Sequence, residues 1–343
     1  MWRAPHRRGV RDEPDCEAMM NRISKIVALA GAAMLGLMAS AAQAQTAWPT
    51  KTVKLIVPFA PGAGADIGAR LAADILARKW GQPVIVENRP GGDSLIAIRA
   101  VIGDNNDHQF LFTPTGNFTP HPYRHEKLGY VRERDLLPVA RFSNTILVVG
   151  ASEMLGVKTI GEFVDLAKKK PGEMNVMVVP GITELVWDNF TTTLNLQITK
   201  VPFTNLTAGA SEMVTNRIQA AMTALAIQQP VLQGKGARLL AVTSRNRVEI
   251  LKDVPTVIEG GVPSLELEGL VGAFAAPSLT AELRKRIGDD IAAVARDPEI
   301  AAKLVSSGQV PNPGGAEEFS ADILRQEAQV AAMAKVVGLK RMD

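Results

Sequence analysis

Short apolar runs alternate with stretches of helical periodicity along most of the chain. Residues 53–57 form an apolar run of strand length, and residues 67–80 then place a large apolar side chain about once per helical turn. Gly81 and Pro83 follow, a combination that commonly ends a helix. Because strands that alternate with helices build layered proteins with parallel pairing, the sequence predicts an α/β fold with mostly parallel sheets.

The same alternation continues toward the C-terminus. It predicts strands at residues 84–86, 110–112, 176–179, 198–201, 218–221 and 239–242, and helices at residues 160–169, 184–194, 208–216, 283–294 and 319–337. The sequence has no low-complexity linker, so a division into lobes requires strands that cross from one to the other. Residues 142–146 and 268–272 are the candidate crossings.

The N-terminal region has the pattern of a secretory signal. Arg22 and Lys25 precede an apolar run at residues 26–40, and Ala42-Gln43-Ala44 then matches the small-x-small pattern of a cleavage site. A membrane-spanning helix would need about 20 apolar residues, which this run lacks. Residues 1–44 are therefore expected to be a signal peptide with an upstream extension, in which Met19 or Met20 is a better start than Met1.

Charge and cysteine content exclude several classes of protein. A chain that begins at Gln45 keeps 32 of the 38 basic and 31 of the 35 acidic residues, so its surface is nearly neutral and no nucleic-acid partner is expected. Cys16 lies ahead of the cleavage site, which leaves no thiol for a disulfide, a metal site or a lipid anchor. The expected product is soluble and periplasmic.

The segment between the first strand and the first helix is the best candidate for a binding loop. Gly62 and Gly64 allow a ligand to approach the main chain, and the following helix N-terminus offers unpaired N–H groups to an anion. Asp66 is placed to cap that helix. An ordinary strand-to-helix turn is the alternative.

The same loop also suggests a nucleotide site. Gly62, Gly64 and Gly68 give G-x-G-x-x-x-G, and Glu87 ends the next strand, where a ribose-binding acid would lie. The spacing departs from G-x-G-x-x-G, and the Asp66 carboxylate would lie near the pyrophosphate. An exported α/β enzyme that binds a phosphate or nucleotide here stays the alternative function.

Neither the histidines nor any known motif indicates a catalytic or metal site. The sequence contains no G-x-S-x-G, C-x-x-C or H-E-x-x-H motif. His121 and His125 are four residues apart, but Pro120 and Pro122 argue against one continuous helix that would present both to a metal ion. They are expected to be solvated loop residues, and no catalytic residue, cofactor or metal site is predicted.

Several ordered blocks resemble the Bug family of extracytoplasmic receptors, the solute-binding components of tripartite tricarboxylate transporters. These blocks are Trp48-Pro49 and residues 57–66, 86–91, 239–244, 253–257 and 275–277. The resemblance covers the chain from about Trp48 to the C-terminus. It implies a type II periplasmic binding protein fold of two α/β lobes, with residues 45–144 and 270–343 in lobe 1 and residues 145–269 in lobe 2.

The resemblance also implies the site and the partners. A carboxylate would be held mainly by backbone and water between loop 59–66 and loop 180–183, without a cofactor, and a monomer would pass it to a membrane permease or sensor. The expected ligand-binding residues are Phe59, Ala60, Pro61, Gly62, Ala63, Gly64, Ala65, Asp66, Thr113, Thr115, Gly116, Pro180, Gly181, Ile182, Thr183, Phe203, Thr204 and Thr223.

The second lobe departs from the family pattern. Residues 181–185 and 201–205 and the pair Thr223-Ala224 are more apolar than their counterparts in the family. A wall formed by Ile182, Leu185, Phe203 and Ala224 favours a monocarboxylate with an apolar or lightly hydroxylated body. An interaction protein that has lost ligand binding is a further alternative.

The cleavage pattern yields the first testable prediction. Material recovered from the periplasm should begin at Gln45, because the small residues Ala42 and Ala44 flank the predicted site. N-terminal sequencing checks this. An intact Met1 or Met20 on the exported protein would contradict it.

Overall fold

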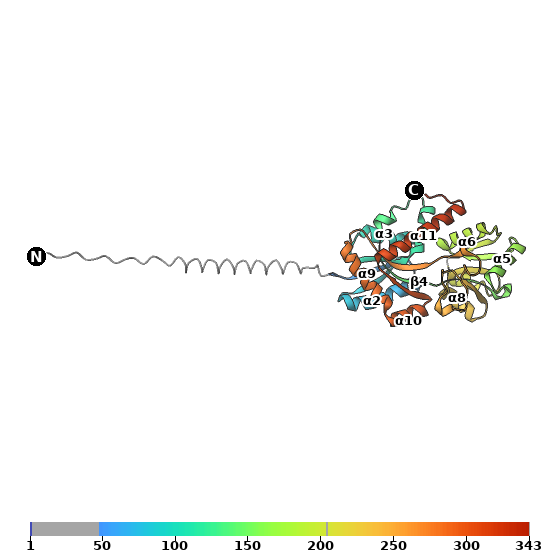
Figure 1. The fold of residues 1–343 in the computed structure, drawn as a ribbon, viewed down its shortest axis with the longest axis horizontal. Helices are drawn as coiled ribbons and strands as arrows, with labels where there is room; N and C mark the ends of the chain where they lie inside the picture. The colour runs from blue at the N-terminus through green and yellow to red at the C-terminus, as the bar shows by residue number, and fades with distance from the viewer. Residues whose placement is uncertain (2–47, 204, 343) are drawn as a thin grey trace. The chain divides into compact units, whose positions relative to one another are not determined.

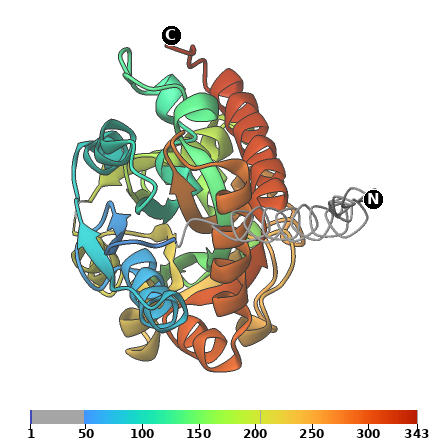
Figure 2. The same cartoon turned by 90° about the vertical axis from the view of Figure 1, so that its left-hand side faces the viewer.

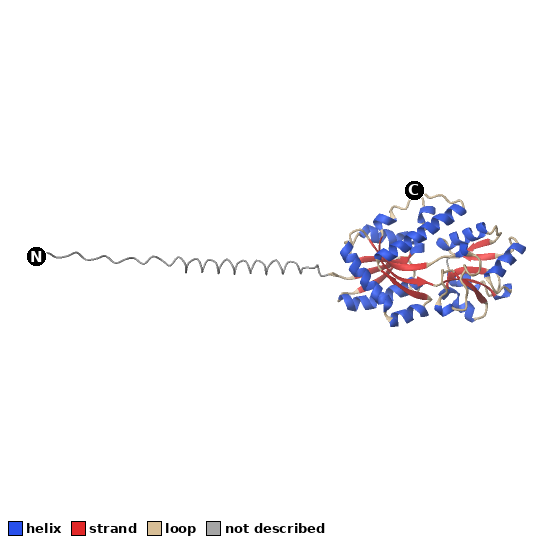
Figure 3. Ribbon diagram, in the orientation of Figure 1, coloured by secondary structure: helices blue, strands red, loops and turns tan. Residues whose placement is uncertain are grey.

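The structure, a computed structural model, describes Met1 and residues 48–203 and 205–342. Lys51–Asp343 form one unit, separate from residues 1–50, and the fold described below is that of this unit. Its strands form two sheets flanked by helices, as Figures 1 and 3 show. The predicted signal peptide and its cleavage site lie outside the described residues.

The first sheet has the strand order β11-β4-β10-β3-β1-β2. Strand β1 pairs in parallel with β2 and β3, whereas β10 pairs antiparallel with β3 and β4, and β11 antiparallel with β4. These strands are β1 (Val53–Val57), β2 (Val84–Asn88), β3 (Gln109–Pro114), β4 (Leu137–Thr145), β10 (Gly269–Ala275) and β11 (Gln309–Gly314).

The second sheet has the strand order β7-β6-β8-β5-β9. Strand β6 pairs in parallel with β7 and β8, and β5 pairs antiparallel with β8 and β9. These strands are β5 (Leu147–Ser152), β6 (Asn175–Val178), β7 (Thr199–Pro202), β8 (Ala220–Ala224) and β9 (Ala237–Val242).

Helices connect and cover the strands. The α-helices are α2 (Gly64–Trp80), α3 (Leu95–Asp104), α4 (Arg132–Asp135), α5 (Ile160–Lys169), α6 (Ile182–Thr193), α7 (Leu206–Ser211), α8 (Leu225–Gln233), α9 (Ala281–Arg296), α10 (Pro298–Ser306) and α11 (Ala316–Val336). No described helix is both long enough and apolar enough to cross a membrane.

Alternation along the strands gives the second sheet two buried faces. In β6, Val176 and Val178 join a core with α5 and α6, while Met177 between them joins another core that includes Val231 of α8. Successive side chains of a strand point to opposite faces, so a continuous apolar run fits a sheet covered on both sides. This arrangement explains why the strand runs are apolar throughout rather than alternating.

The chain passes from the first sheet to the second with almost no connecting segment. Strand β4 ends at Thr145 in the first sheet, and β5 begins at Leu147 in the second, so Ile146 alone separates them. The return path runs from β9 to β10, whose first residue is Gly269. Both predicted crossings, residues 142–146 and 268–272, coincide with these passages. The two-lobed α/β fold expected from the sequence is confirmed, with each sheet defining a lobe.

Parallel pairing is less extensive than expected, since both sheets are mixed. The antiparallel pairs involve β4, β5 and β10, the strands at the crossings, together with β11. A strand that returns from the other lobe enters the sheet against the direction of its neighbours. The crossing itself therefore supplies the antiparallel pairs.

Helix α11 joins the cores of both lobes. Phe319 and Ile323, near its beginning, pack in the first lobe with Ile98 of α3. Val330 and Met333, near its end, pack in the second lobe with the core around α6. Figure 2 shows α11 as the long red helix along one side of the unit. Helix α11 therefore contributes to the cores of both lobes, and the expected division into residues 45–144 and 270–343 and residues 145–269 stays a prediction.

Candidate functional site

A cavity of about 190 Å³ lies between the two lobes. Loops after strands of both sheets contribute to it, as do the crossing segments and α11. Its lining residues are Phe59, Pro114, Gly116, Asn117, Thr145, Leu147, Val179, Ile182, Thr183, Leu206, Thr223, Ala224, Leu267, Glu268, Gly269 and Gln326. Most of these groups are apolar, so the cavity suits a small ligand with a hydrocarbon body.

Two helices of the second lobe begin at this cavity. Ile182 and Thr183 are the first residues of α6, and Ala224 is the N-cap of α8. Gly181, the N-cap of α6, has φ 119° and ψ −141°, a conformation that glycine adopts far more readily than other residues. Helix N-termini carry unpaired N–H groups and the positive end of the helix dipole, which makes this end of the cavity favourable for an anion.

Five of the sequence-predicted residues line the cavity: Phe59, Gly116, Ile182, Thr183 and Thr223. The Thr183 hydroxyl donates to the Val179 carbonyl at 2.8 Å, and the Thr223 hydroxyl accepts from Gln228 Nε2 at 3.1 Å. Both hydroxyls therefore already have intramolecular partners.

The lobes are in close contact at Gly116. A Cβ atom on this residue would lie 2.7 Å from Cγ2 of Ile182, closer than carbon atoms normally come. Gly116 follows β3 of the first lobe, whereas Ile182 begins α6 of the second. A side chain at position 116 would therefore hold the lobes apart at the mouth of the cavity.

Most of the glycine-rich loop lies away from the cavity. Ala60, Pro61 and Gly62 are exposed, and Ala63, Gly64 and Ala65 do not line the cavity either. The Gly62 N–H, a candidate donor to the ligand, donates instead to Asp66 Oδ2 at 2.8 Å.

Asp66 is a buried anchor of this loop and not a helix cap. Helix α2 begins at Gly64 with Ala63 as its N-cap, so the prediction that Asp66 caps it is wrong. Its carboxylate instead accepts hydrogen bonds from Gly62 N–H, from Arg70 at 3.0 Å and from Asn88 Nδ2 at 2.7 Å. Burial alone would raise the pKa of Asp66, but Arg70, Gly62 and Asn88 outweigh it and hold the pKa below 3.8.

Three of the remaining predicted residues, Thr113, Thr115 and Phe203, have structural contacts. The buried Thr115 hydroxyl donates to Gln326 Oε1 at 2.5 Å, and the buried Thr113 hydroxyl accepts from Asn117 Nδ2 at 3.0 Å. Phe203 packs on a core of the second lobe, as the wall residue Leu185 does on another. Pro180 is exposed, and Thr204 lies outside the described residues.

Residues of the crossing segments line the cavity but were not predicted as site residues. They are Thr145, Leu147, Leu267, Glu268 and Gly269. The two carboxylate oxygens of Glu268 accept from Asn144 Nδ2 at 2.9 Å and from the Arg245 N–H at 3.1 Å. The predicted crossings could have indicated these residues, because strands that join two lobes run beside the space between the lobes.

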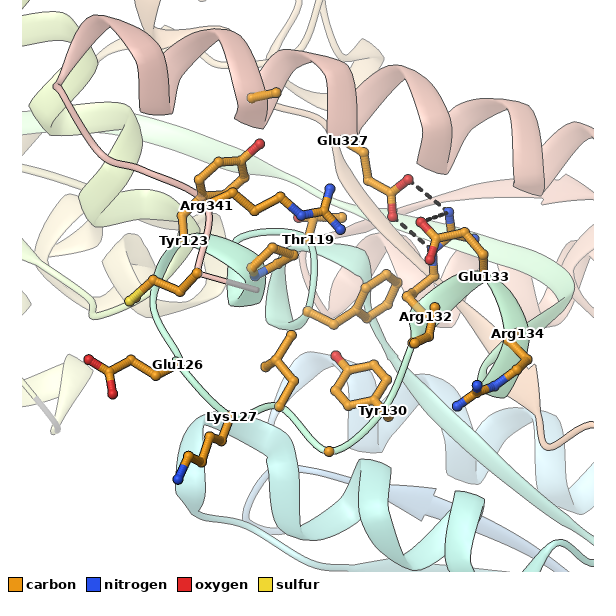
Figure 4. A pocket seen from close by; sticks show the side chains of 17 residues that line it. Thr119, Tyr123, Glu126, Lys127, Tyr130, Arg132, Glu133, Arg134, Glu327 and Arg341 are labelled. Carbon is orange, nitrogen blue, oxygen red and sulfur yellow. Dashed lines mark hydrogen bonds and ion pairs between the residues drawn. The ribbon is translucent and has the colours of Figure 1, made fainter.

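A larger hollow of about 690 Å³ lies in the first lobe. It is bordered by residues 118–134, by α11 and by Arg341 and Met342, and Figure 4 shows the Arg132–Glu327 pair at one end. Arg132 donates to both Glu327 oxygens, at 2.7 and 2.8 Å, although burial still raises the pKa of Glu327. None of the sequence-predicted site residues lines it, so its size alone does not make it the ligand site.

His121 differs from the sequence expectation. Its side chain is fully buried, whereas that of His125 is 29% exposed, so the prediction of two solvated loop histidines is wrong for His121. One ring nitrogen lies 2.9 Å from the Tyr130 hydroxyl and the other 2.9 Å from the Asp93 carbonyl oxygen. Burial lowers the pKa of His121 to about 4, so the ring is neutral near neutral pH.

The two lobes, the crossing strands and the cavity between them define a solute-binding receptor. Residues 68–339 match the tripartite tricarboxylate transporter family receptor, and the chain belongs to this family. It is therefore a receptor and not an enzyme, which leaves the nucleotide-binding alternative without support.

Relatives of known sequence or structure agree with this assignment. Protein BugT of Bordetella pertussis is 24% identical, over 63% of this chain and 68% of its own. The structure of a periplasmic transporter is 26% identical with a TM-score of 0.75, covering 86% of this chain and all of that one. A protein from R. palustris, solved with adipate, is 25% identical with a TM-score of 0.74, covering 85% and 99%.

The anchored carboxylate of Asp66 leads to a pH-dependent prediction. Asp66→Asn should lower the free energy of unfolding by about 1.5–3 kcal/mol near neutral pH, because hydrogen bonds to a charged group are lost. Since folding lowers the pKa of Asp66 below 3.8, its contribution is present above that value and is lost as the pH falls through the folded-state pKa. Urea denaturation of the wild type and of Asp66→Asn, at about pH 7 and about pH 3, measures the difference in unfolding free energy between them.

Asp74→Asn is the matched control, because Asp74 lies exposed on the same helix and should change stability little at either pH. If the loss of unfolding free energy in Asp66→Asn is as large at about pH 3 as at about pH 7, the role assigned to this carboxylate is contradicted.

Proposed function

We propose that the protein is a periplasmic receptor that captures a small organic carboxylate in the cavity between its lobes. The observation that carries the proposal is an apolar cavity of about 190 Å³ at which α6 and α8 of the second lobe begin. The helix N-termini suit a carboxylate group, and the apolar lining suits the rest of the ligand.

The charge on the ligand is accommodated by backbone groups. Among the described residues, the cavity is lined by no Lys or Arg. Main-chain N–H groups at helix N-termini can share a single negative charge without a basic side chain. A ligand with three carboxylates would place two of its charges against the apolar wall without partners. Burying an unpaired charge costs on the order of several kcal/mol.

The body of the ligand faces hydrocarbon. Leu147, Val179, Leu206 and Leu267 line the cavity, and each Å² of apolar surface that they bury contributes roughly 25 cal/mol. Glu268 is the one carboxylate among the described lining residues, and each of its oxygens already accepts one hydrogen bond, so the ammonium of an amino acid would have to share it with these donors. A monocarboxylate with an apolar or lightly hydroxylated body therefore fits better than an amino acid. The relative solved with adipate, a dicarboxylate, supports the aliphatic body of the ligand and not its single carboxylate.

Ligand capture would use closure of the lobes about the crossing strands. A receptor of this kind acts by presenting its closed, ligand-bound form to a membrane permease or sensor. The predicted signal peptide supports export to the periplasm, and family membership supports a membrane partner.

A thermal-shift panel tests the ligand class. Short aliphatic and aromatic monocarboxylates should raise the melting temperature of the mature protein, because a ligand that binds only the folded state stabilises it. Citrate, aspartate and glutamate should give smaller shifts. Strong stabilisation by citrate or aspartate, with none from the monocarboxylates, would reject the proposed class. No shift from any acid would favour a receptor that has lost ligand binding.

A variant at the lobe contact tests the site itself. Gly116→Val should weaken binding of the best acid from the panel at least about tenfold, because the added side chain clashes with Ile182 when the lobes close. Calorimetric titration measures the affinity. Gly103→Ala is the control, since a Cβ atom there has open space in α3 and should leave binding unchanged. Full affinity in a folded Gly116→Val protein would place the ligand elsewhere.

A further inference from the structure

Three side chains with metal-binding atoms converge in the first lobe, outside the cavity between the lobes. The ligand atoms of Asp93, His121 and His125 all lie within 4.8 Å of one another. His125 Nε2 is 2.9 Å from Asp93 Oδ2, and His121 Nε2 is 3.8 Å from the same oxygen. The distances are close to those between neighbouring ligands of one small cation, whose bonds to N and O are about 2.0–2.2 Å long.

We propose that Asp93, His121 and His125 bind a divalent transition-metal ion of the Zn²⁺ type. Two imidazoles and a carboxylate are a donor set that suits zinc and its neighbours better than Ca²⁺ or Mg²⁺, which prefer oxygen ligands. The prolines beside His121 argue only against two ligands on one helix. Here a short 3₁₀ turn, His121–Tyr123, and the loop after it bring the rings together.

The buried ring of His121 has a partner that would orient it toward a metal ion. Its Nδ1 lies 2.9 Å from the hydroxyl of Tyr130, a residue labelled in Figure 4. In the metal-free ring Nε2 donates to the Asp93 carbonyl oxygen and Nδ1 accepts from Tyr130. A cation at Nε2 would replace that proton, and the ring would then carry its proton on Nδ1 and donate to Tyr130. Metal-binding histidines are usually held in this way by a hydrogen bond from the other ring nitrogen.

Asp93 faces the histidines through an uncommon backbone conformation. It has φ 53°, and the following Ser94 has φ 68°, both in the left-handed region. This turn places the Asp93 carbonyl oxygen 2.9 Å from His121 Nε2 and its carboxylate against His125. Asp93 thus offers two oxygens to the same space. Its side chain and that of His125 are each 29% exposed, which gives an ion a path from solvent.

Arg124 competes with a cation for Asp93. Its Nε lies 3.5 Å from Asp93 Oδ2, while its Nη1 donates to Glu184 of α6 in the second lobe at 3.2 Å. A positive charge this close lowers the affinity for a metal ion without removing a ligand. The proposed site therefore predicts opposite effects for removal of a ligand and removal of Arg124.

Calorimetric titration of the mature, untagged and chelator-treated protein with ZnCl₂ tests the site. One equivalent should bind, and His125→Gln or Asp93→Asn should weaken it at least about tenfold, the smallest loss typical even for a residue that only supports a ligand. His108→Gln is the control, because His108 pairs with Asp107 and is not part of the cluster. Undetectable binding, or binding unchanged by both ligand variants, would overturn the proposal.

The variant Arg124→Gln provides a second, independent test of the metal site. It should raise the affinity for Zn²⁺ a few-fold, since it removes a neighbouring positive charge and keeps all three ligands. Binding of Co²⁺ should also give visible absorption bands that disappear in His125→Gln. An affinity unchanged or lowered in a folded Arg124→Gln protein would contradict an ion at Asp93. These measurements use no carboxylate ligand, so they are independent of the proposed receptor function.

Discussion

The two-lobed arrangement depends on a single residue, Ile146, that connects the two sheets. It is the residue between a strand of the first sheet and a strand of the second, and it is almost fully buried. Its N–H donates to the Gly308 carbonyl at 3.0 Å, and its carbonyl accepts from the Leu225 N–H at 2.8 Å. Backbone groups from both lobes thus satisfy the peptide at the crossing, where an unpaired polar group would be costly. The cavity lies beside this point because the lobes diverge from it.

The repeating elements of the fold were predictable because burial imposes a period on the sequence. Strands such as Val53–Val57 and helices such as Ile160–Lys169 follow the periods of their faces. Six of the described strands and α-helices were not predicted, namely β5, β11, α3, α4, α8 and α10, and prolines explain two of these misses. Strand β11 contains Pro311 and Pro313, which argue against a strand, and α8 contains Pro230, which argues against a helix. Tertiary packing overrides these local preferences.

Some residues of the candidate site could be predicted from the sequence, and others could not. Ile182 and Thr183 follow β6 and Thr223 lies near the end of β8, and the resemblance to the receptor family indicated these positions. Gln326 and Leu267 reach the cavity only through long-range packing. The role of Asp66 was misread because its partner Asn88 lies 22 residues away, across a strand pair. The approach of Asp93 to His121, 28 residues apart, likewise depends on loop geometry that no periodicity records.

Helix α11 has a consequence for the order in which the protein can fold during synthesis. Phe319 and Ile323 complete one hydrophobic core, and Val330 and Met333 complete the other. Domains usually fold as soon as they emerge, the N-terminal one first. Here the first core lacks some of its side chains until residue 323 has been made, and the second until residue 333. The growing chain therefore lacks a finished lobe until translation is nearly over, and the two lobes mature together rather than in sequence.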